Sequence, residues 1–181
     1  MIRGDKICLT AIERGDLSQL LKWRNDLRVN FRQFVELNMA NQEAWFDELN
    51  GSHDTIMFAI RTVPEVALAE DTTRLLGACG WTYIDWKNRK AEASIYIGEE
   101  AHRHHGHGGD ALRLLMRYGF EELGLHRAFV EVFEFNTESI KLFESAGFHR
   151  EGVFRERLWR NGQWHNSILF SILQNEYYSP S

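Results

Sequence analysis

The sequence predicts a single α+β (α/β) domain built on a mixed, mostly antiparallel sheet of about seven strands with about four flanking helices. The chain has 181 residues, of which 44% are apolar and 26% charged, values typical of one globular domain. Strand and helix patterns do not alternate regularly along it, which argues against a doubly wound parallel fold. Near the end, Asn161-Gly162 separates two strand-like runs and predicts a two-residue hairpin.

The N-terminal part is expected to form one strand and two helices. Lys6–Ile12 has the alternation of a strand, and Asp16 is expected to cap a helix that ends at Arg24-Asn25-Asp26. A second helix is expected to start near Asn41 and to end at Asn50-Gly51. Between the helices, the ambiguous stretch Val29–Leu37 is interpreted as a loop over a pocket.

Strands dominate the middle of the chain. They are expected at Thr55–Arg61, Leu75–Asp85 and Ala91–Ile97, with lengths that suit an antiparallel meander. A loop from Thr62 to about Arg74, which contains Pro64, is expected to connect the first two.

Helical periodicity returns after the glycines that follow the third of these strands. Asp110–Leu123 carries apolar residues at helical intervals, and Gly124 follows it. Arg127–Phe133 is expected to be a strand. Asn136 is then expected to open a short helix, which Gly147 caps.

Composition argues against several functional classes. Lysine and arginine total 21 against 26 acidic residues, so the net charge is −5, the wrong sign for nucleic acid or an anionic membrane. A cationic small molecule or a basic peptide is the better partner. No apolar run approaches the ~20 residues of a membrane span, and the charged first residues do not form a signal peptide. Cys8 and Cys79 are therefore expected to be free thiols in a cytoplasmic protein.

The segment Tyr96–Leu112 carries the clearest chemical signal. A strand is followed by a glycine-rich loop and then by an amphipathic helix. Glycines let a backbone approach a ligand closely, and the unpaired amides at a helix start favour an anion such as a pyrophosphate. The loop lacks the Lys-Ser or Lys-Thr of a P-loop, and its glycine spacing differs from a dinucleotide fingerprint.

Two spaced motifs resemble one family. Arg103–Gly108 (R-H-H-G-H-G) resembles the [Q/R]-x-x-G-x-G/A signature of the GNAT superfamily of acetyl-CoA-dependent N-acetyltransferases, and Asn136–Phe148 resembles its N-x-x-[AS]-x-x-L-[YF]-E-x-x-G-F segment. Trp23–Asp26 and Glu151–Gln163 resemble the RimJ/RimL-like and spermidine acetyltransferase-like branches. The resemblance covers nearly the whole chain, which we therefore expect to be one N-acetyltransferase domain over residues 1–181.

The resemblance implies that acetyl-CoA lies between two splayed parallel strands, Ala91–Ile97 and Arg127–Phe133. Backbone groups of one strand would align the pantetheine arm, and loop amides would hold the pyrophosphate. Asn136 and Ser139 would lie beside the thioester sulfur. The implied cofactor-binding residues are Ile95, Tyr96, Ile97, Arg103, His104, His105, Gly106, His107, Gly108, Gly109, Asn136, Ser139 and Phe143.

Catalytic roles follow from the same resemblance. Direct transfer needs a neutral amine, donors at the developing oxyanion and a proton for the leaving thiolate. Many family members have a tyrosine where this chain has Phe143, so Ser139 is the alternative proton donor, or merely a capping residue. Glu92 is either the general base or a carboxylate that orients the substrate. Asn136 completes the expected catalytic set.

Other readings stay open. Asp85 and Trp86 line an acceptor cleft or belong to a hairpin turn. The histidines near 104 assist phosphate binding or, less favoured, bind a metal; we expect no metal. The expected partners are acetyl-CoA and an amine acceptor, with a homodimer left open. The acceptor is a protein N-terminus, a polyamine or other small amine, or a nucleotide-linked amino sugar. A low-turnover CoA sensor is the non-enzymatic alternative.

Overall fold

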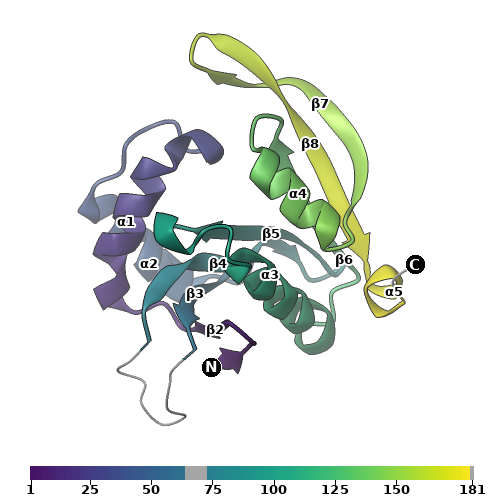
Figure 1. The fold of residues 1–181 in the computed structure, drawn as a ribbon, viewed down its shortest axis with the longest axis horizontal. Helices are drawn as coiled ribbons and strands as arrows, with labels where there is room; N and C mark the ends of the chain where they lie inside the picture. Colours follow the sequence, from purple (N-terminus) through teal and green to yellow (C-terminus); the bar gives the residue numbers. More distant parts are fainter. Residues whose placement is uncertain (64–72, 180–181) are drawn as a thin grey trace.

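The computed structural model describes residues 1–63 and 73–179, and these form one sheet with helices on both faces (Figure 1). The strand order is β1-β2-β3-β4-β5-β6-β8-β7, and the β5–β6 pair is parallel while the other neighbours are antiparallel. The strands are β1 (Ile2–Arg3), β2 (Ile7–Thr10), β3 (Ile56–Thr62), β4 (Leu75–Asp85), β5 (Lys90–Ile97), β6 (Arg127–Phe133), β7 (His149–Arg160) and β8 (Gln163–Leu173). The α-helices are α1 (Leu17–Asp26), α2 (Met39–Gly51), α3 (His107–Arg117), α4 (Thr137–Ser145) and α5 (Gln174–Tyr178).

The mixed, mostly antiparallel sheet is confirmed, but the element counts were too low. Within the described residues the sheet has eight strands, because Ile2–Arg3 pairs with β2, and α5 adds a fifth helix. A two-residue strand and a five-residue helix are too short to show a periodicity. The loop around Pro64 lies outside the described residues.

Three local expectations were wrong. The second helix starts at Met39, because Asn38 and Asn41 form a reciprocal capping pair just before it. The glycine-rich helix starts at His107 and not at Asp110, so its first turn contains Gly108 and Gly109. Asp16 does not cap α1; its carboxylate accepts hydrogen bonds from Arg61 at 2.7 Å.

Several turn predictions are confirmed. Asn136 caps α4 through its side chain, and Gly147 follows that helix with a φ of +85°. Asn161 and Gly162 both have positive φ, as a type I′ hairpin requires.

Cys8 and Cys79 are both buried free thiols, and burial raises the pKa of each. None of the helices in the described ranges is long and apolar enough to cross a membrane.

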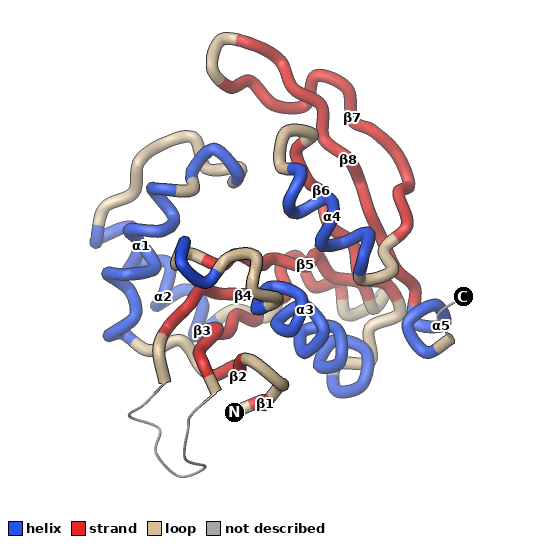
Figure 2. The backbone as a smooth tube through the Cα atoms, viewed as in Figure 1, coloured by secondary structure: helices blue, strands red, loops and turns tan. Residues whose placement is uncertain are grey.

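Helices cover the two faces of the sheet in different combinations (Figure 2). On one face, α3 and α4 contribute to a large core with Trp81 and Phe170. On the other face, α1 and α2 pack over Ala59 and Ala78. A Cβ on Gly98 would lie 2.0 Å from the Trp23 ring, so glycine there lets α1 approach the end of β5.

The parallel pair β5–β6 separates partway along its length. Pairing runs from Lys90↔Arg127 to Glu92↔Phe129 and then stops, although β5 continues to Ile97 and β6 to Phe133. Beyond Glu92 each strand keeps only its outer antiparallel neighbour. The splayed strand pair is therefore present, and it leaves a strand edge free on either side of a gap in the sheet.

Asp110 fixes the start of α3 to the N-terminal strand. Its carboxylate is buried and accepts hydrogen bonds from the amides of Lys6 (2.7 Å) and Ile7 (3.1 Å) and from Arg113 (2.5 Å). Burial alone would raise the pKa of Asp110, but these donors outweigh it and lower the pKa.

We predict that Asp110→Ala lowers the free energy of unfolding by about 2–4 kcal/mol at pH 7, because it leaves two backbone amides without an acceptor. Since the folded-state pKa is depressed, this contribution is present above the unfolded pKa of ~3.9 and is lost as the pH falls through the folded value. Urea titrations at pH 7 and pH 3 measure the loss of stability and its dependence on pH. Asp5→Ala is the control, because exposed Asp5 also pairs with Arg113. An equal loss in both variants would contradict the prediction.

Candidate active site

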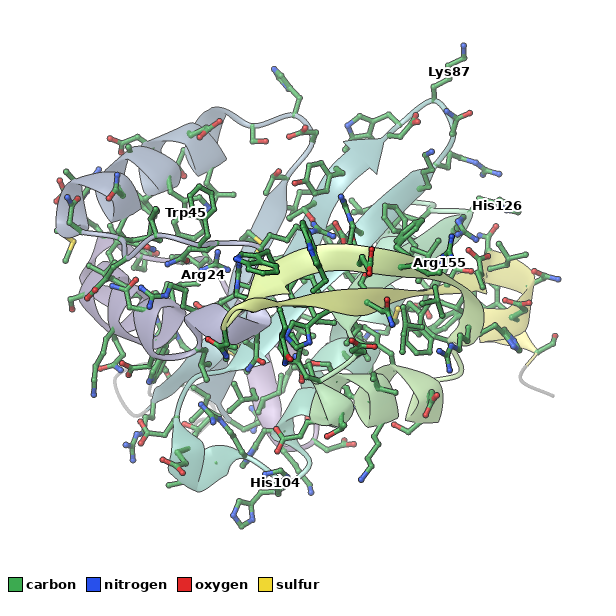
Figure 3. All side chains as sticks on the ribbon, turned by 90° about the horizontal axis from the view of Figure 1, so that it is seen from above. Arg24, Trp45, Lys87, His104, His126 and Arg155 are labelled. Atoms are coloured by element: carbon green, nitrogen blue, oxygen red, sulfur yellow. The ribbon has the colours of Figure 1, made fainter. Side chains whose placement is uncertain are left out.

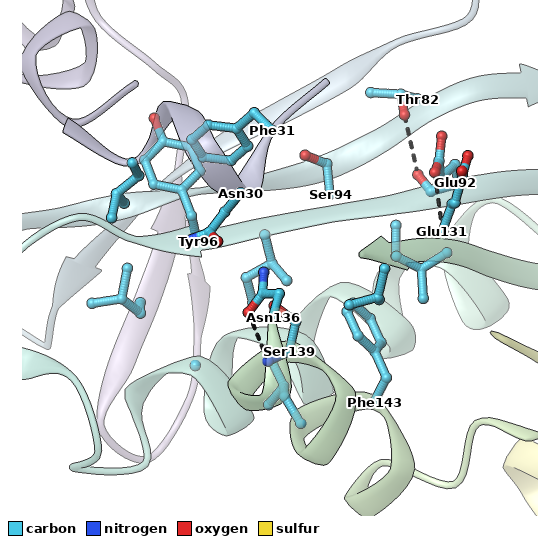
Figure 4. Close-up of a pocket in the computed structure, with 18 of the residues that line it drawn as sticks. Asn30, Phe31, Thr82, Glu92, Ser94, Tyr96, Glu131, Asn136, Ser139 and Phe143 are labelled. Carbon is cyan, nitrogen blue, oxygen red and sulfur yellow. Dashed lines mark hydrogen bonds between the residues drawn. The ribbon is translucent and has the colours of Figure 1, made fainter. Parts of the chain in front are cut away.

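The gap between β5 and β6 opens into a cavity of about 750 Å³ (Figure 4). Its walls come from both strands, from the starts of α3 and α4, and from the segment between α1 and α2. The structure places most of the sequence-predicted site residues on these walls. They are Glu92, Ile95, Tyr96, Ile97, Arg103, His104, Gly106, Gly108, Gly109, Asn136, Ser139 and Phe143.

The cavity has two sides because side chains alternate along β5. Ile95 and Ile97 pack with the core under α3, whereas Tyr96 packs with the core under α1. Glu92 has the same parity as Tyr96. Figure 4 shows Tyr96 and Phe31 across β5 from Ser139. We call the α3–α4 side the donor side and the α1–α2 side the acceptor side.

Free backbone amides line the start of α3. None of the amides of residues 104–109 has a hydrogen-bond acceptor within residues 1–63 and 73–179. A Cβ on Gly108 would meet Ile97 and Leu142 only at ordinary distances of 3.8 and 4.0 Å, and one on Gly109 would meet nothing within 4 Å. The fold itself therefore does not need glycine at these two positions. A phosphate group that approaches the free amides closely would need glycine at these positions, because a side chain would occupy its space.

The side chains of this loop are engaged elsewhere. Arg103 donates to the carbonyls of Ile97 and Gly98, both at 3.1 Å, and so fixes the loop to the end of β5. His107 and His105 do not line the cavity. The ring of His107 bonds to the His102 carbonyl, and the His105 carbonyl accepts a hydrogen bond from the Lys6 ammonium at 2.9 Å.

His104 lies at the rim. Its ring is 3.2 Å from the Glu138 carboxylate, and Figure 3 shows it at the outer edge of the molecule. In the described part of the chain, no group of three or more His, Cys, Asp or Glu residues is placed to hold a metal ion. His102 and His104 line the cavity together with Gly106, Gly108 and Gly109, so the loop presents free backbone amides beside two histidines.

Asn136 and Ser139 stand at the N-terminus of α4 on the donor side. Asn136 Oδ1 accepts a hydrogen bond from the Ser139 amide at 3.2 Å, so the capping role is real. This capping interaction uses only the backbone amide of Ser139 and leaves its hydroxyl group unused. Among the described residues, the Ser139 hydroxyl and the Asn136 side-chain nitrogen have no partner, and both residues line the cavity. Phe143 is buried with its ring edge-on to Phe148, and it has no proton to donate.

Glu92 lies on the acceptor side, at the last paired position before the strands separate. It is only 5% exposed. Its two carboxylate oxygens accept hydrogen bonds from the two terminal nitrogens of Arg32, at 2.9 and 2.5 Å, and Oε1 also accepts from the Glu131 amide at 3.3 Å. Both oxygens are occupied, so this carboxylate can take a proton from an acceptor only after Arg32 moves.

Glu131, on β6, is a functional candidate that the sequence reasoning missed. Its buried carboxylate accepts hydrogen bonds from Ser167 at 2.6 Å and from Arg32 and Arg157, each at 3.1 Å. Burial raises the pKa of Glu131, but these donors outweigh that effect and lower it. The signal was available, since a lone glutamate interrupts the apolar strand sequence A-F-V-E-V-F.

The segment between α1 and α2 covers the acceptor side, as expected for Val29–Leu37. Asn25 holds its far end, because its side chain both donates to and accepts from the backbone of Leu37 at 2.9 Å. Arg160, next to the hairpin tip, donates to the carbonyls of Phe31, Arg32 and Gln33 at 3.2, 3.4 and 2.9 Å. This segment is therefore tied to α1 at one point and to the hairpin at another.

Asp85 and Trp86 belong to a turn and do not line the cavity. The Asp85 carboxylate accepts from the amide and the side chain of Asn88 at 2.9 and 2.7 Å, which is the pattern of a local turn. Trp86 donates to the His53 carbonyl at 2.6 Å. The hairpin reading of these two residues is the correct one.

Comparisons with known proteins agree with this geometry. A family model described as an acetyltransferase (GNAT) domain matches residues 6–149. The probable N-acetyltransferase YjcK of Bacillus subtilis is 38% identical over 185 residues, which covers 96% of this chain and 97% of the relative. The spermidine N(1)-acetyltransferase of Vibrio cholerae is 28% identical over 178 residues, which covers 98% of this chain and 99% of the relative.

The solved structures agree on the fold. The crystal structure of spermidine N-acetyltransferase from Vibrio cholerae in complex with CoA and spermine superposes with a TM-score of 0.86 at 23% identity. The match covers 96% of this chain and 98% of the other.

We predict that Gly108→Val weakens acetyl-CoA binding about tenfold or more, which is ~1.4 kcal/mol, because a branched side chain occupies the space in front of the free amides. The protein should still fold, since the new Cβ meets no close contact. Calorimetric titration measures the affinity. The matched control is Gly15→Val, on an exposed glycine with open space around it. Unchanged affinity in folded Gly108→Val would contradict the assignment of this loop to the pyrophosphate.

Proposed function

This chain belongs to the GNAT family of acetyltransferases and is an acetyl-CoA-dependent N-acetyltransferase; from this membership we propose that its acceptor is a cationic primary amine. A polyamine or another small amine is the first candidate, and a protein N-terminus the second. The similarity to spermidine N(1)-acetyltransferases supports the first candidate.

The observation that carries the proposal is the charge of the acceptor side. Four of the five acidic residues that line the cavity lie on this side, Glu48, Asp54, Glu92 and Glu131, and the fifth, Glu138, lies in the first turn of α4. An anionic acceptor would need free cations here, and the three nearest arginines of the N-terminal segment are engaged or lie elsewhere. Arg24 stacks 4.1 Å above the Phe31 ring, Arg32 is bound by two carboxylates, and Arg28 does not line the cavity. An ammonium group therefore fits this side better than a nucleotide-linked amino sugar does.

The proposed mechanism uses the gap in the sheet as the meeting point. Acetyl-CoA approaches from the donor side, with its pyrophosphate on the amides of residues 104–109 and its pantetheine arm along the free edge of β5. The amine approaches from the acceptor side and attacks the thioester carbon near Glu92. Backbone N–H groups at the free edge of β5 stabilise the oxyanion, and Glu92, directly or through a water, accepts the amine's proton. The leaving thiolate meets Ser139 and Asn136.

Three finer expectations are proposals of the same kind. We propose that the chain belongs to the RimJ/RimL-like or the spermidine acetyltransferase-like branch and acts in the cytoplasm, as its sequence motifs and free cysteines suggest. We also propose that it forms a homo-oligomer, at least a dimer. The dodecameric structure of the Vibrio cholerae relative and the exposed Trp159 and Trp164 of the hairpin support this.

A panel of amines tests the proposed function directly. CoA release is followed with a thiol reagent in the presence of spermidine, 1,4-diaminobutane, peptides with free N-termini and a nucleotide-linked amino sugar. Turnover with the cationic amines is expected. Turnover with the sugar nucleotide alone would overturn the acceptor class, and binding of acetyl-CoA without any turnover would favour the sensor.

We predict that Ser139→Ala lowers the rate constant for acetyl transfer, because the hydroxyl is unpaired and faces the expected sulfur position. A general acid typically contributes about 10²–10⁴-fold. Phe143→Tyr should preserve or raise turnover, since it adds a hydroxyl to the cavity wall. Single-turnover measurements separate chemistry from product release. An unchanged rate constant in Ser139→Ala would leave that residue with its backbone-capping role alone.

We predict that Glu92→Gln leaves acetyl-CoA affinity unchanged and lowers turnover near neutral pH. The amide cannot accept a proton from the ammonium, so turnover should recover partly as the pH approaches the acceptor's own pKa of ~10.4 for a lysine-like amine. The pH profiles of kcat and kcat/KM measure this effect. A raised acceptor KM with an unchanged kcat profile would make Glu92 a substrate-orienting charge.

A further inference from the structure

We propose that Arg32 occupies the position of the acceptor's ammonium group and that an acceptor must displace it to reach Glu92. The proposal rests on the proposed function in that the displacing cation is taken to be the amine acceptor. Arg32 is thus a specificity-determining residue, because it sets how strongly a cation must bind before it can react.

Three side chains form a seat for a cation, which we call the cation seat: Glu92, Glu131 and Tyr83. Arg32 bonds to Glu92 through both terminal nitrogens and to Glu131 at 3.1 Å. Its guanidinium carbon lies 5.9 Å from the centroid of the Tyr83 ring, within the range of a cation–π contact. Two carboxylates and an aromatic face recognise an ammonium ion as well as they recognise the guanidinium of Arg32.

The cation seat belongs to the rigid sheet, whereas its occupant does not. Glu92 and Glu131 lie on paired strands, and their side chains are only 7% and 8% exposed. Arg32 comes from a segment without regular secondary structure, and its side chain is 46% exposed. Buried carboxylates need some cation beside them, and the requirement is for a positive charge and N–H donors, which an ammonium group supplies as well as a guanidinium does. The seat therefore persists when its occupant changes.

Two features lie near the cation seat, and the first of them points to a ligand with N–H donors. Gln33 Oε1 is buried and lacks a hydrogen-bond partner among the described residues, and Gln33 lines the same cavity. Tyr83 has a φ of +52° and is 62% exposed, at a point where the β4–β5 register shifts. A tyrosine held in the left-handed region, with its ring exposed, is a strained feature of the kind found at functional sites.

Arg160 holds the segment that carries Arg32 in place. Its guanidinium donates to three consecutive carbonyls, including that of Arg32 itself. Loss of these bonds would keep the Arg32 side chain but release its backbone. Substitution of Arg160 is therefore an independent way to weaken the binding of Arg32 in the cation seat. Arg155 lies on the same strand (Figure 3), and among the described residues it makes no ion pair. It is therefore a matched control.

Removing Arg32 as an internal competitor raises the apparent affinity for the acceptor. The factor is the inverse of the fraction of wild-type molecules in which the cation seat is free. If Arg32 is displaced in about one molecule in ten, Arg32→Gln should lower the acceptor KM about tenfold. Arg160→Gln should lower it in the same direction by a smaller factor, and Arg155→Gln should not change it. Because Arg155 and Arg160 do not line the cavity, kcat should change less than about threefold in Arg160→Gln and Arg155→Gln.

The experiment measures KM and kcat for spermidine in wild type, Arg32→Gln, Arg160→Gln and Arg155→Gln, with acetyl-CoA affinity and circular dichroism as checks of folding. A lower KM in both Arg32→Gln and Arg160→Gln, with a similar kcat in Arg160→Gln, supports the proposal. An unchanged or higher KM in folded Arg32→Gln overturns it. If Arg32→Gln does not fold, Arg160→Gln decides, and an unchanged KM there overturns the proposal as well.

A failure of the proposed function is distinguishable from a failure of this inference. If wild type turns over no amine, calorimetric titration of spermidine onto the CoA-bound proteins replaces the kinetic readout. Tighter binding by Arg32→Gln than by wild type then supports the inference although the acceptor class is wrong. Equal or weaker binding overturns it.

Discussion

The loss of pairing between β5 and β6 after Glu92 is the constraint on which the rest of the site depends. A parallel pair that continued to Ile97 would satisfy its own backbone groups and would leave no gap in the sheet. Glu92 itself marks the point of separation, because its carboxylate accepts the hydrogen bond of the Glu131 amide that a neighbouring strand would otherwise take. A buried side chain thus replaces a backbone partner, which keeps the opening at a fixed place in the sheet.

The two sides of the gap present different chemical groups and therefore suit different ligands. On the donor side, the groups that face the cavity are backbone amides and small polar side chains at the N-termini of α3 and α4, and these suit an anionic, extended ligand. On the acceptor side, they are carboxylates and aromatic rings, which suit a cation. Under the proposed function, the two faces of one sheet would bind substrates of opposite charge.

The sequence predicted the local structure of the donor side well because that information is local. Glycine spacing, a helix start and an asparagine cap are encoded within short segments, so Gly106–Gly109 and Asn136 could be assigned from motif and physics together. The error of three residues at the start of α3 has a local cause, because glycines at a helix N-terminus look the same as glycines in a loop. The missed β1 and α5 lack the length that periodicity requires.

The acceptor side was not predictable in the same way, because its contacts join distant parts of the chain. Arg32 meets Glu92 across 60 positions and Glu131 across 99, and Arg160 reaches the Arg32 carbonyl across 128. No short pattern encodes such pairs. What the sequence did contain was Glu92 and Glu131 in otherwise apolar strands, and a buried charge of this kind requires a partner that only the fold can supply.

The two sides also differ in how they are stabilised without substrate. The free amides on the donor side are partly exposed, so water can satisfy them when no phosphate is bound. Two of the acceptor-side carboxylates, Glu92 and Glu131, are buried, so the fold must provide cations beside them, and it does so with Arg32 and Arg157. Stability of the free enzyme and access for a cationic acceptor therefore depend on the same carboxylates. Any change that strengthens the internal ion pairs at this site must also make the site harder for an amine to enter.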